Sequence, residues 1–192
     1  MVVRVDVVAR AFEEVYGGRA REVRKKRRVL VTEPGGRKVE QGYIRELAEG
    51  KDLTIVCGRY GGMDERVRVA LATEAASLGD FVLSGGEIVA AALSDAVVRL
   101  LEGVVGNSES LVGESFSEKG IIGPPQYTRP AVWDGEGVPA VLLSGNHAKI
   151  RAWREEEARG RADARAVARG EAEMKPYPAP EVPNTTRERR QT

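Results

Sequence analysis

The sequence predicts an α/β domain in which a parallel sheet is flanked by helices. Short apolar runs typical of buried strands alternate along the chain with longer segments of helical character. Two runs break into glycine-rich loops, CGRYGGMDERV (57–67) and SLGDFVLSGGE (77–87), where a buried strand would end. Open α/β sheets bind ligands in loops at the carboxyl ends of their strands. The two loops therefore predict a backbone-lined pocket for a small polar ligand.

Length and composition indicate one ordinary domain followed by a tail. The chain has 192 residues, and its 42% hydrophobic content is enough for a packed core. No apolar run approaches the length of a membrane span, and no signal-peptide pattern follows Met1. We therefore expect a cytoplasmic protein that does not enter a membrane.

The chain has a single cysteine, Cys57, and a single histidine, His147. This excludes an internal disulfide and any metal site built from several cysteines or histidines. Cys57 ends an apolar run and is interpreted as a packing residue rather than a nucleophile. His147 is interpreted as a structural hydrogen-bonding residue, with a role as general base as the alternative.

The first half of the chain predicts strands at 2–8 and 28–32 and helices at 9–15 and 39–49. The EPGG sequence at 33–36 is a strong turn signal after the second of these strands. Further strands are expected at 53–57 and 81–83, with a helix at 64–73 between them. Ser84 and Glu87 stand three residues apart, as in a capping box.

The helix that follows Glu87 is expected to reach about Leu101, with apolar residues on more than one side. Such a helix is buried all round, and a partner subunit would bury it. Residues 103–137 show little periodicity, and a loop of that length is usually functional or disordered. A last strand is expected at 139–143 and a last helix from 147 to about 159. The Pro-rich segment beyond Met174 predicts a disordered tail.

A strongly basic run, RAREVRKKRR, occupies residues 19–28. It could neutralise phosphates of a nucleic acid, or it could be a solvated helix face. If it contacts RNA, removing its charges should weaken RNA binding and reduce the salt dependence of that binding.

Six segments, found in the same order as in the family, give the chain a resemblance to the bacterial tRNA (guanine-N1)-methyltransferases of the trefoil-knotted SPOUT class. They are CGRYGGMDERV (57–67), SLGDFVLSGGE (77–87), DAVVRLLEGVVGNSES (95–110), ESFSEKG (114–120), PQYTRPAVW (125–133) and VPAVLLSGNHAKIRAWR (138–154). The resemblance covers roughly residues 29–154. It implies a SPOUT-type parallel sheet with a deep C-terminal trefoil knot, and a homodimer with its active site at the interface.

The resemblance also implies that S-adenosylmethionine is bound in a bent shape by the knot loops. Glycines suit such a cradle because backbone without a Cβ can approach the ligand closely. The alternative is that these glycines only form tight turns. The family's cofactor positions correspond here to Thr32, Glu33, Pro34, Gly58, Tyr60, Ser77, Leu78, Gly79, Phe81, Leu83, Gly85 and Gly86.

Methyl transfer to the N1 of guanine needs an aligned acceptor and a base that removes its proton. By resemblance, Arg99 contacts the guanine and Glu114 takes the proton. Arg99 could instead be a helix-end cation paired with Glu102, and Glu114 a surface charge. Tyr127, Thr128 and Arg129 either close over the partner's pocket or anchor their own loop.

The chain departs from the family pattern at three acidic positions. Gly61 and Gly123 stand where the family has carboxylates, and Glu114 stands where it has aspartate. These carboxylates are associated with the family's magnesium dependence, so we predict no metal site and question the role of magnesium. The family's N-terminal part is expected to be shortened and most of its tRNA-binding domain absent. We therefore expect a methyltransferase domain at 1–160 and a charged helix end and tail at 161–192.

Three functions are consistent with these residues. The first is methylation of N1 of a guanine next to the anticodon, with tRNA as the partner. The second is a methyltransferase of the same fold redirected to another acceptor, either a small molecule or another RNA. The third is a dimer that binds the cofactor without transferring its methyl group. The glycine loops favour the first two, and the sequence does not identify the acceptor.

Overall fold

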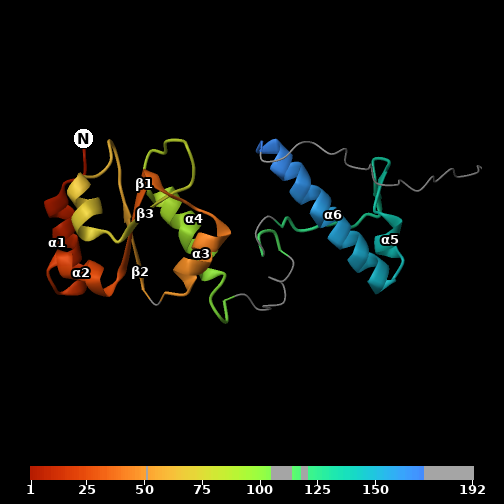
Figure 1. Ribbon diagram of the computed structural model, residues 1–192, viewed down its shortest axis with the longest axis horizontal. Coiled ribbons are helices and arrows are strands. Elements are labelled where there is room, and N and C mark those ends of the chain that lie inside the picture. Colours follow the sequence, from red (N-terminus) through yellow and green to blue (C-terminus); the bar gives the residue numbers. More distant parts are fainter. Residues whose placement is uncertain (51, 105–113, 118–120, 171–192) are drawn as a thin grey trace, which may run out of the picture. The chain divides into compact units, whose positions relative to one another are not determined.

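The computed structural model describes residues 1–50, 52–104, 114–117 and 121–170, and the chain divides into two compact units, Met1–Ser108 and Glu109–Thr192. The first unit contains a parallel three-stranded sheet with the order β2-β1-β3 (Figure 1). Its strands are β1 (Arg28–Lys38), β2 (Leu53–Cys57) and β3 (Glu74–Ser77). The predicted α/β class, with a parallel sheet flanked by helices, is confirmed.

Helices cover both faces of the sheet in the first unit (Figure 1). On one face lie α1 (Val5–Tyr16), α2 (Ala20–Lys26) and the π-helical turn η1 (Val67–Leu71). On the other face lie α3 (Gln41–Ala48) and α4 (Glu87–Val98). Three predicted elements have counterparts in the structure. The helix expected at 39–49 corresponds to α3, the helix expected at 64–73 to η1, and the strand expected at 53–57 to β2.

Strand β1 supplies the centre of both hydrophobic cores because its side chains alternate between the two faces. Val29 and Val31 are buried in a cluster with α1, α2 and η1, whereas Leu30 is buried in a cluster with α3 and α4. Burying all three branched side chains stabilises the sheet between its helical layers. The central strand therefore fixes where the carboxyl ends of its neighbours lie.

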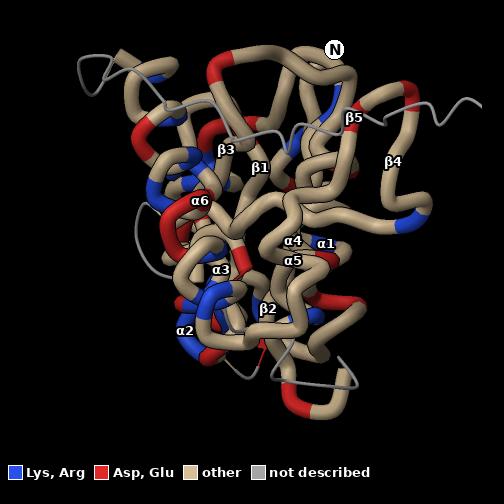
Figure 2. The backbone as a smooth tube through the Cα atoms, turned by 90° about the vertical axis from the view of Figure 1, so that its right-hand side faces the viewer, with Lys and Arg blue, Asp and Glu red and all other residues tan. Residues whose placement is uncertain are grey.

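The N-terminal segment is helical, so the predicted strand at 2–8 is wrong. Val8 and Phe12 stand one helical turn apart, and both are buried on the sheet side of α1. Gly17 ends this helix in the left-handed conformation (φ 68°). The helix propensity of valine is low, but burial of this apolar stripe decides the outcome. The basic run at 19–28 forms α2 and the start of β1, and most charges of α2 are positive (Figure 2).

The third strand lies at Glu74–Ser77, and the predicted strand at 81–83 is an exposed loop. The side chains of Phe81 and Val82 are 55% and 85% exposed. Small residues suit β3 because the backbones approach closely here. A Cβ on Gly36 of β1 would lie 2.5 Å from the Ala76 nitrogen. The predicted turn at 33–36 is instead part of β1, where the register with β3 shifts between Thr32 and Arg37.

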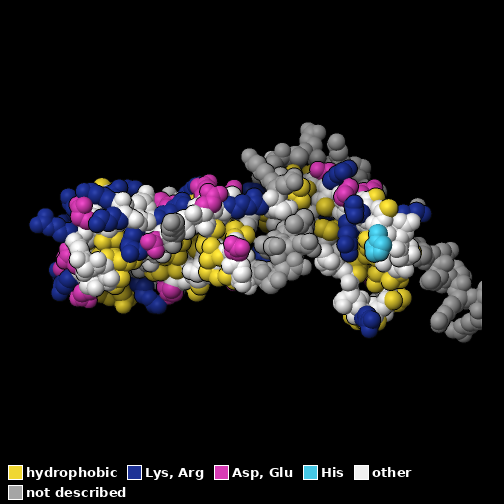
Figure 3. Space-filling model, turned by 90° about the horizontal axis from the view of Figure 1, so that it is seen from below, with side chains coloured by type: hydrophobic (Ala, Val, Ile, Leu, Met, Phe, Trp, Pro, Cys, Tyr) yellow, Lys and Arg dark blue, Asp and Glu magenta, His cyan; other side chains and the backbone are white. Residues whose placement is uncertain are grey.

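Helix α4 begins without the predicted capping box. Its N-cap residue is Gly86, and no side chain caps it. The Glu87 carboxylate bonds to Arg59 instead. One side of the helix is buried through Val89, Leu93 and Val97, whereas Ile88 is exposed. Figure 3 shows further hydrophobic side chains at the surfaces of both units.

The second unit contains the hairpin strands β4 (Val132–Trp133) and β5 (Glu136–Gly137), the short helix α5 (Ala140–Leu143) and the long helix α6 (His147–Ala168). The predicted strand at 139–143 is therefore wrong, because Pro139 precedes a helical turn. Helix α6 begins as predicted, with the Asn146 side chain as its cap, but runs past 159. The predicted disordered tail beyond Met174 lies outside the described residues. Among the described helices, none has the length and apolar character needed to cross a bilayer.

Candidate functional site

A cavity of about 440 Å³ lies at the carboxyl ends of β2 and β3, beside the middle of β1. Loops that leave β2 and β3 form most of its walls, as expected for a ligand site in an open α/β sheet. Its volume falls within the range of about 300–1,000 Å³ that is typical of small-molecule sites. The cavity belongs entirely to the first unit.

The structure brings all the predicted cofactor-binding residues together around this one cavity. They come from three separate stretches of sequence that meet only because the strands are parallel. The predicted residues that line it are Thr32, Glu33, Pro34, Gly58, Tyr60, Ser77, Leu78, Gly79, Phe81, Leu83, Gly85 and Gly86.

Two glycine loops are joined to each other at the cavity wall. The Gly86 nitrogen donates a hydrogen bond to the Gly58 carbonyl oxygen at 2.8 Å, and Arg59 forms an isolated antiparallel bridge with Gly85. A Cβ on Gly86 would collide with the Thr32 hydroxyl and lie 3.1 Å from the Cys57 Cα. The absence of a side chain at Gly86 is therefore required for the loops to meet.

An ion pair reinforces the same junction. The Arg59 Nη2 donates to the Glu87 Oε1 at 2.6 Å. The Glu87 Oε2 is buried and, among the described residues, accepts no hydrogen bond. Glu87 also lies in the first turn of α4, where a negative charge is favoured by the helix dipole. We refer to Arg59 and Glu87 as the clasp.

The loop after β3 is held by its own serine. The Ser77 hydroxyl accepts from the Gly79 nitrogen at 3.2 Å and bonds to the Gly79 carbonyl oxygen at 3.0 Å. The Phe81 ring packs on this turn so closely that a Cβ on Gly79 would lie 2.9 Å from it. The turn thus presents backbone groups and an aromatic side chain to the cavity together.

The N-terminal residues hold the remaining loop. The Gly61 nitrogen donates to the Met1 carbonyl oxygen, and the Val3 nitrogen to the Gly62 carbonyl oxygen, each at 2.9 Å. The Asp64 nitrogen donates in turn to the Val3 carbonyl oxygen at 2.9 Å. Residues 1–3 therefore act as a short edge segment along the loop that lines the cavity.

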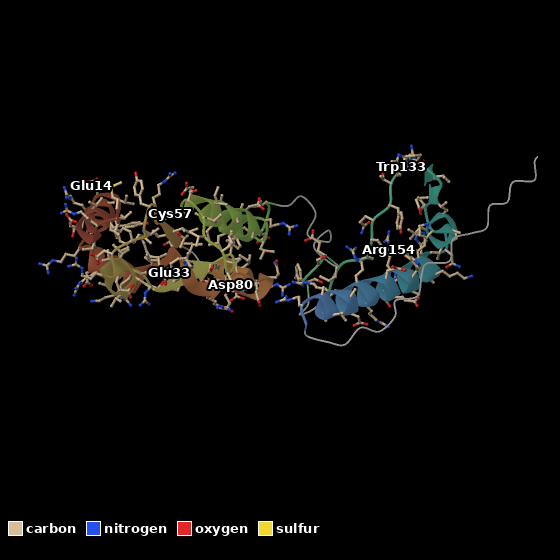
Figure 4. All side chains as sticks on the ribbon, turned by 90° about the horizontal axis from the view of Figure 1, so that it is seen from above. Glu14, Glu33, Cys57, Asp80, Trp133 and Arg154 are labelled. Carbon is tan, nitrogen blue, oxygen red and sulfur yellow. The ribbon has the colours of Figure 1, made fainter. Side chains whose placement is uncertain are left out.

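Charged side chains surround the polar part of the cavity. Hydrogen bonds from the Arg66 side chain and backbone lower the pKa of Asp64 to about 2. Arg68 pairs with Glu65 and lies 3.8 Å from the Glu33 carboxylate. Figure 4 labels Glu33, which lines the cavity, and Cys57, which ends β2. Burial and then the charge of Glu87 raise the pKa of Cys57, which favours the neutral thiol and agrees with a packing role.

The sequence interpretation missed part of the lining. Most of the missed residues lie within the two glycine motifs, so the motifs could have predicted them. Arg68 and Val89 lie beyond the motifs, and Ala76 lies just before the second motif. The missed residues are Arg59, Gly61, Gly62, Met63, Asp64, Glu65, Arg68, Ala76, Val82, Ser84 and Val89. Met63, Val82 and Val89 add apolar surface that suits a flat heterocycle.

The two predicted catalytic residues are not among the residues that line this cavity. Arg99 follows the last turn of α4, and its nitrogen donates to the Asp95 carbonyl oxygen at 3.2 Å. Glu114 belongs to the second unit, where it is partly buried. In the described part of the chain, no group of three or more His, Cys, Asp or Glu side chains could hold a metal ion.

Comparison with known proteins gives a family match over most of the chain. The profile of the family described as tRNA (Guanine-1)-methyltransferase TrmD matches residues 1–168. The match therefore extends beyond the resemblance at 29–154 and includes residues 1–28.

Individual relatives carry the name tRNA (guanine-N(1)-)-methyltransferase. One from Persephonella marina is 54% identical over 126 residues, covering 66% of this chain and 49% of the relative. One from Cereibacter sphaeroides is 50% identical over 158 residues, covering 82% and 63%. One from Agrobacterium fabrum is 49% identical over 158 residues, covering 82% and 65%. The chain thus spans about half to two thirds of the length of these curated relatives.

Proposed function

We propose, because this chain belongs to the tRNA (guanine-1)-methyltransferase family, that it transfers a methyl group from S-adenosylmethionine to N1 of a guanine next to the anticodon of tRNA. One observation carries this proposal beyond family membership. Every residue that the family pattern assigns to the cofactor lines a single cavity at the carboxyl edge of the sheet. A protein that had lost the cofactor would not need this convergence.

The residues of the cavity fit S-adenosylmethionine. Leu78, Phe81 and Leu83 supply apolar surface for the adenine, and the glycine loops supply backbone groups for its polar edge and the ribose. Glu33 and Asp64 offer carboxylates for the positive charge of the methionine end. Ser77 and Gly86 are fixed by their own contacts, so the cavity walls are preorganised.

When bound, S-adenosylmethionine supplies an electrophilic methyl group on a sulfonium sulfur. In the proposed reaction, Arg99 would orient the guanine and Glu114 would accept the N1 proton as the N–C bond forms. The methyl–sulfur bond would break in the same step, leaving a neutral thioether. A carboxylate suits this task because its oxygen can take the proton directly. Glu114 is a methylene longer than the family's aspartate, so its reach differs.

The finer architecture and the assembly are part of the proposal. We expect the deep C-terminal trefoil knot of the SPOUT class, a methyltransferase domain at 1–160 and a homodimer in the cytoplasm. Exposed apolar side chains on and beside α4, such as Ile88 and Val98, support a subunit interface there. The basic helix α2 would contribute phosphate contacts to the tRNA.

The test is methyl transfer from labelled S-adenosylmethionine to unmodified tRNA that carries a G beside the anticodon. Wild type should form N1-methylguanine, and Glu114→Gln should lose at least 100-fold in rate, a typical effect of removing a general base. Glu114→Asp should retain activity. Glu136→Gln, which removes an exposed carboxylate from the same unit as Glu114, is the matched control. Wild-type activity in Glu114→Gln would remove this carboxylate from the mechanism.

The same assay with magnesium or with a chelator addresses the metal. Gly61 and Gly123 stand where the family has carboxylates, so product should form in both conditions. These two positions also favour the second candidate, a methyltransferase that acts on another acceptor. Cofactor binding without transfer to tRNA would support that candidate, or a protein that only binds the cofactor.

A further inference from the structure

The second unit contains a cavity of its own, of about 350 Å³. The extended segment before β4 forms one wall, and helices α5 and α6 form the other. Val138, Leu142 and Ile150 provide an apolar floor. The methyl-transfer chemistry proposed above makes no use of this cavity.

Two arginines line the cavity, Arg129 on the extended segment and Arg154 on α6. Figure 4 labels Arg154 on this helix. Both are exposed, and in the part of the chain that the structure describes neither guanidinium takes part in a hydrogen bond or an ion pair. None of the lining residues is acidic. Two unpaired guanidinium groups at one cavity therefore favour an anion, and planar guanidinium forks match phosphate oxygens.

An aromatic side chain lies at the same cavity. Tyr127 lines it and is 47% exposed, so part of its ring surface is open to a ligand. Trp153 packs against the Tyr127 ring, with ring centroids 6.2 Å apart and planes at 53°. This contact supports the orientation of the tyrosine before any ligand arrives. Apolar floor, aromatic ring and cationic rim together match the parts of a nucleotide.

We propose that this cavity binds one nucleoside monophosphate unit, with the base against Tyr127 and the phosphate held by Arg129 and Arg154. Stacking on aromatic rings is tolerant of base identity, whereas guanidinium groups recognise the phosphate. The unit can be a free nucleotide or one residue of an RNA strand. Only its assignment to RNA rests on the proposed function, since binding of a free nucleotide requires no methyl transfer.

Calorimetric titration of the full chain tests the site. The probes are guanosine monophosphate, guanosine and inorganic phosphate. Arg129→Gln and Arg154→Gln should each weaken binding of the monophosphate about tenfold, as expected for loss of a charge-assisted hydrogen bond, and should leave guanosine unaffected. Tyr127→Leu should weaken both the monophosphate and guanosine, because stacking is lost while apolar volume is kept.

Arg151→Gln is the matched control, because it removes the same charge from α6 at an exposed position that does not line the cavity. If Arg151→Gln weakens binding as much as Arg154→Gln, the effect is diffuse charge and the site is refuted. Equal affinity for inorganic phosphate and for the monophosphate, or no saturable binding of the monophosphate, would also refute it. Unchanged circular dichroism spectra would show that the variants remain folded.

A labelled single-stranded RNA oligonucleotide distinguishes the two sources. Tighter binding of the RNA than of the free nucleotide, weakened by Arg154→Gln, supports a substrate contact. Binding of the monophosphate alone supports a free-nucleotide site. Titration of S-adenosylmethionine into the same variants separates this proposal from the proposed function. Cofactor affinity should be the same in Arg154→Gln and wild type, and failure of wild type to bind the cofactor would contradict only the methyltransferase.

Discussion

The first unit is built around two hydrophobic clusters on opposite faces of a sheet, whereas no described residue of the second unit is buried. The cavity of the first unit is walled by backbone loops that leave buried strands. The cavity of the second unit is walled by side chains on a helix and an extended segment. The difference teaches that two cavities of similar size can depend on different parts of a fold. The first depends on core packing, and the second depends on individual side chains.

Truncation of an apolar side chain should have the largest effect and should separate the two units. Leu93 is fully buried between α4 and the sheet, so Leu93→Ala should lower the free energy of unfolding by about 2–5 kcal/mol through lost burial and a cavity. Leu143 of the second unit is 64% exposed, so Leu143→Ala should change the free energy of unfolding by less than about 0.5 kcal/mol. Urea unfolding measures both, and equal losses would contradict the comparison.

A single methyl group at the loop junction should have the next largest effect. Gly86→Ala forces a Cβ against Thr32 and Cys57, so we expect a loss of about 1–3 kcal/mol in stability and weaker cofactor binding. Gly42→Ala is the control, because open space surrounds Gly42 in α3 and alanine should be tolerated. Thermal unfolding and titration of S-adenosylmethionine measure the two effects. Normal cofactor affinity in Gly86→Ala would show that the junction does not shape the cavity.

Acid should destabilise the first unit through a partly buried network between β1, β3 and α3. Burial raises the pKa of Glu74, but hydrogen bonds from Arg28 and Tyr43 outweigh this and leave its pKa below the ordinary value. The Tyr43 hydroxyl donates to the Glu74 Oε2 at 2.6 Å. A depressed pKa stabilises the fold above the unfolded pKa of about 4.3, and the contribution is lost as the pH falls through the folded pKa.

Glu74→Gln should therefore cost about 1–2 kcal/mol at neutral pH, a modest value because the pair is partly exposed. The difference from wild type should shrink as the pH falls below about 4. Denaturant unfolding across pH measures this change. Glu49→Gln, at an exposed position, is the control. A difference that grows in acid would contradict a lowered pKa for Glu74 in the folded protein.

The clasp should have the smallest effect. The Arg59 side chain is 61% exposed and that of Glu87 is 44% exposed, and ion pairs with this degree of exposure contribute less than about 1 kcal/mol. Arg59→Gln or Glu87→Gln should weaken binding of S-adenosylmethionine about two- to fivefold without changing stability measurably. The double variant, Arg59→Gln with Glu87→Gln, should lose no more affinity than either single variant. A loss equal to the sum of the two single losses would mean that each residue acts alone.

Sequence reasoning identified the residues that line the first cavity better than it identified the strands. The glycine motifs predicted the cavity because close packing excludes any side chain at a position such as Gly86. The glycine that this packing requires is visible in the sequence itself. The third strand could not be found in this way. The EAAS sequence at 74–77 has little strand propensity and pairs because β1 offers it an edge with close backbone approach.

Apolar runs caused the remaining errors. Residues 2–8 and 139–143 contain the branched side chains typical of strands, yet each lies in or next to a helix. For α1 the deciding contact is burial of Val8 and Phe12 on the sheet, a tertiary interaction that a short window of sequence does not contain. Phe81 and Val82 show the opposite case, since apolar residues at the cavity rim imitate a strand while remaining exposed.

The pairing of residues 1–3 with the cavity loop gives the molecule a natural position for a reporter. A fluorophore attached at Met1, which is 82% exposed, would sit beside Gly61 without replacing any residue of the cavity. Its emission should respond when a ligand enters the cavity that the loop lines. By the same geometry, a bulky affinity tag fused at this end would crowd the loop, so tags used for binding assays belong at the other end of the chain.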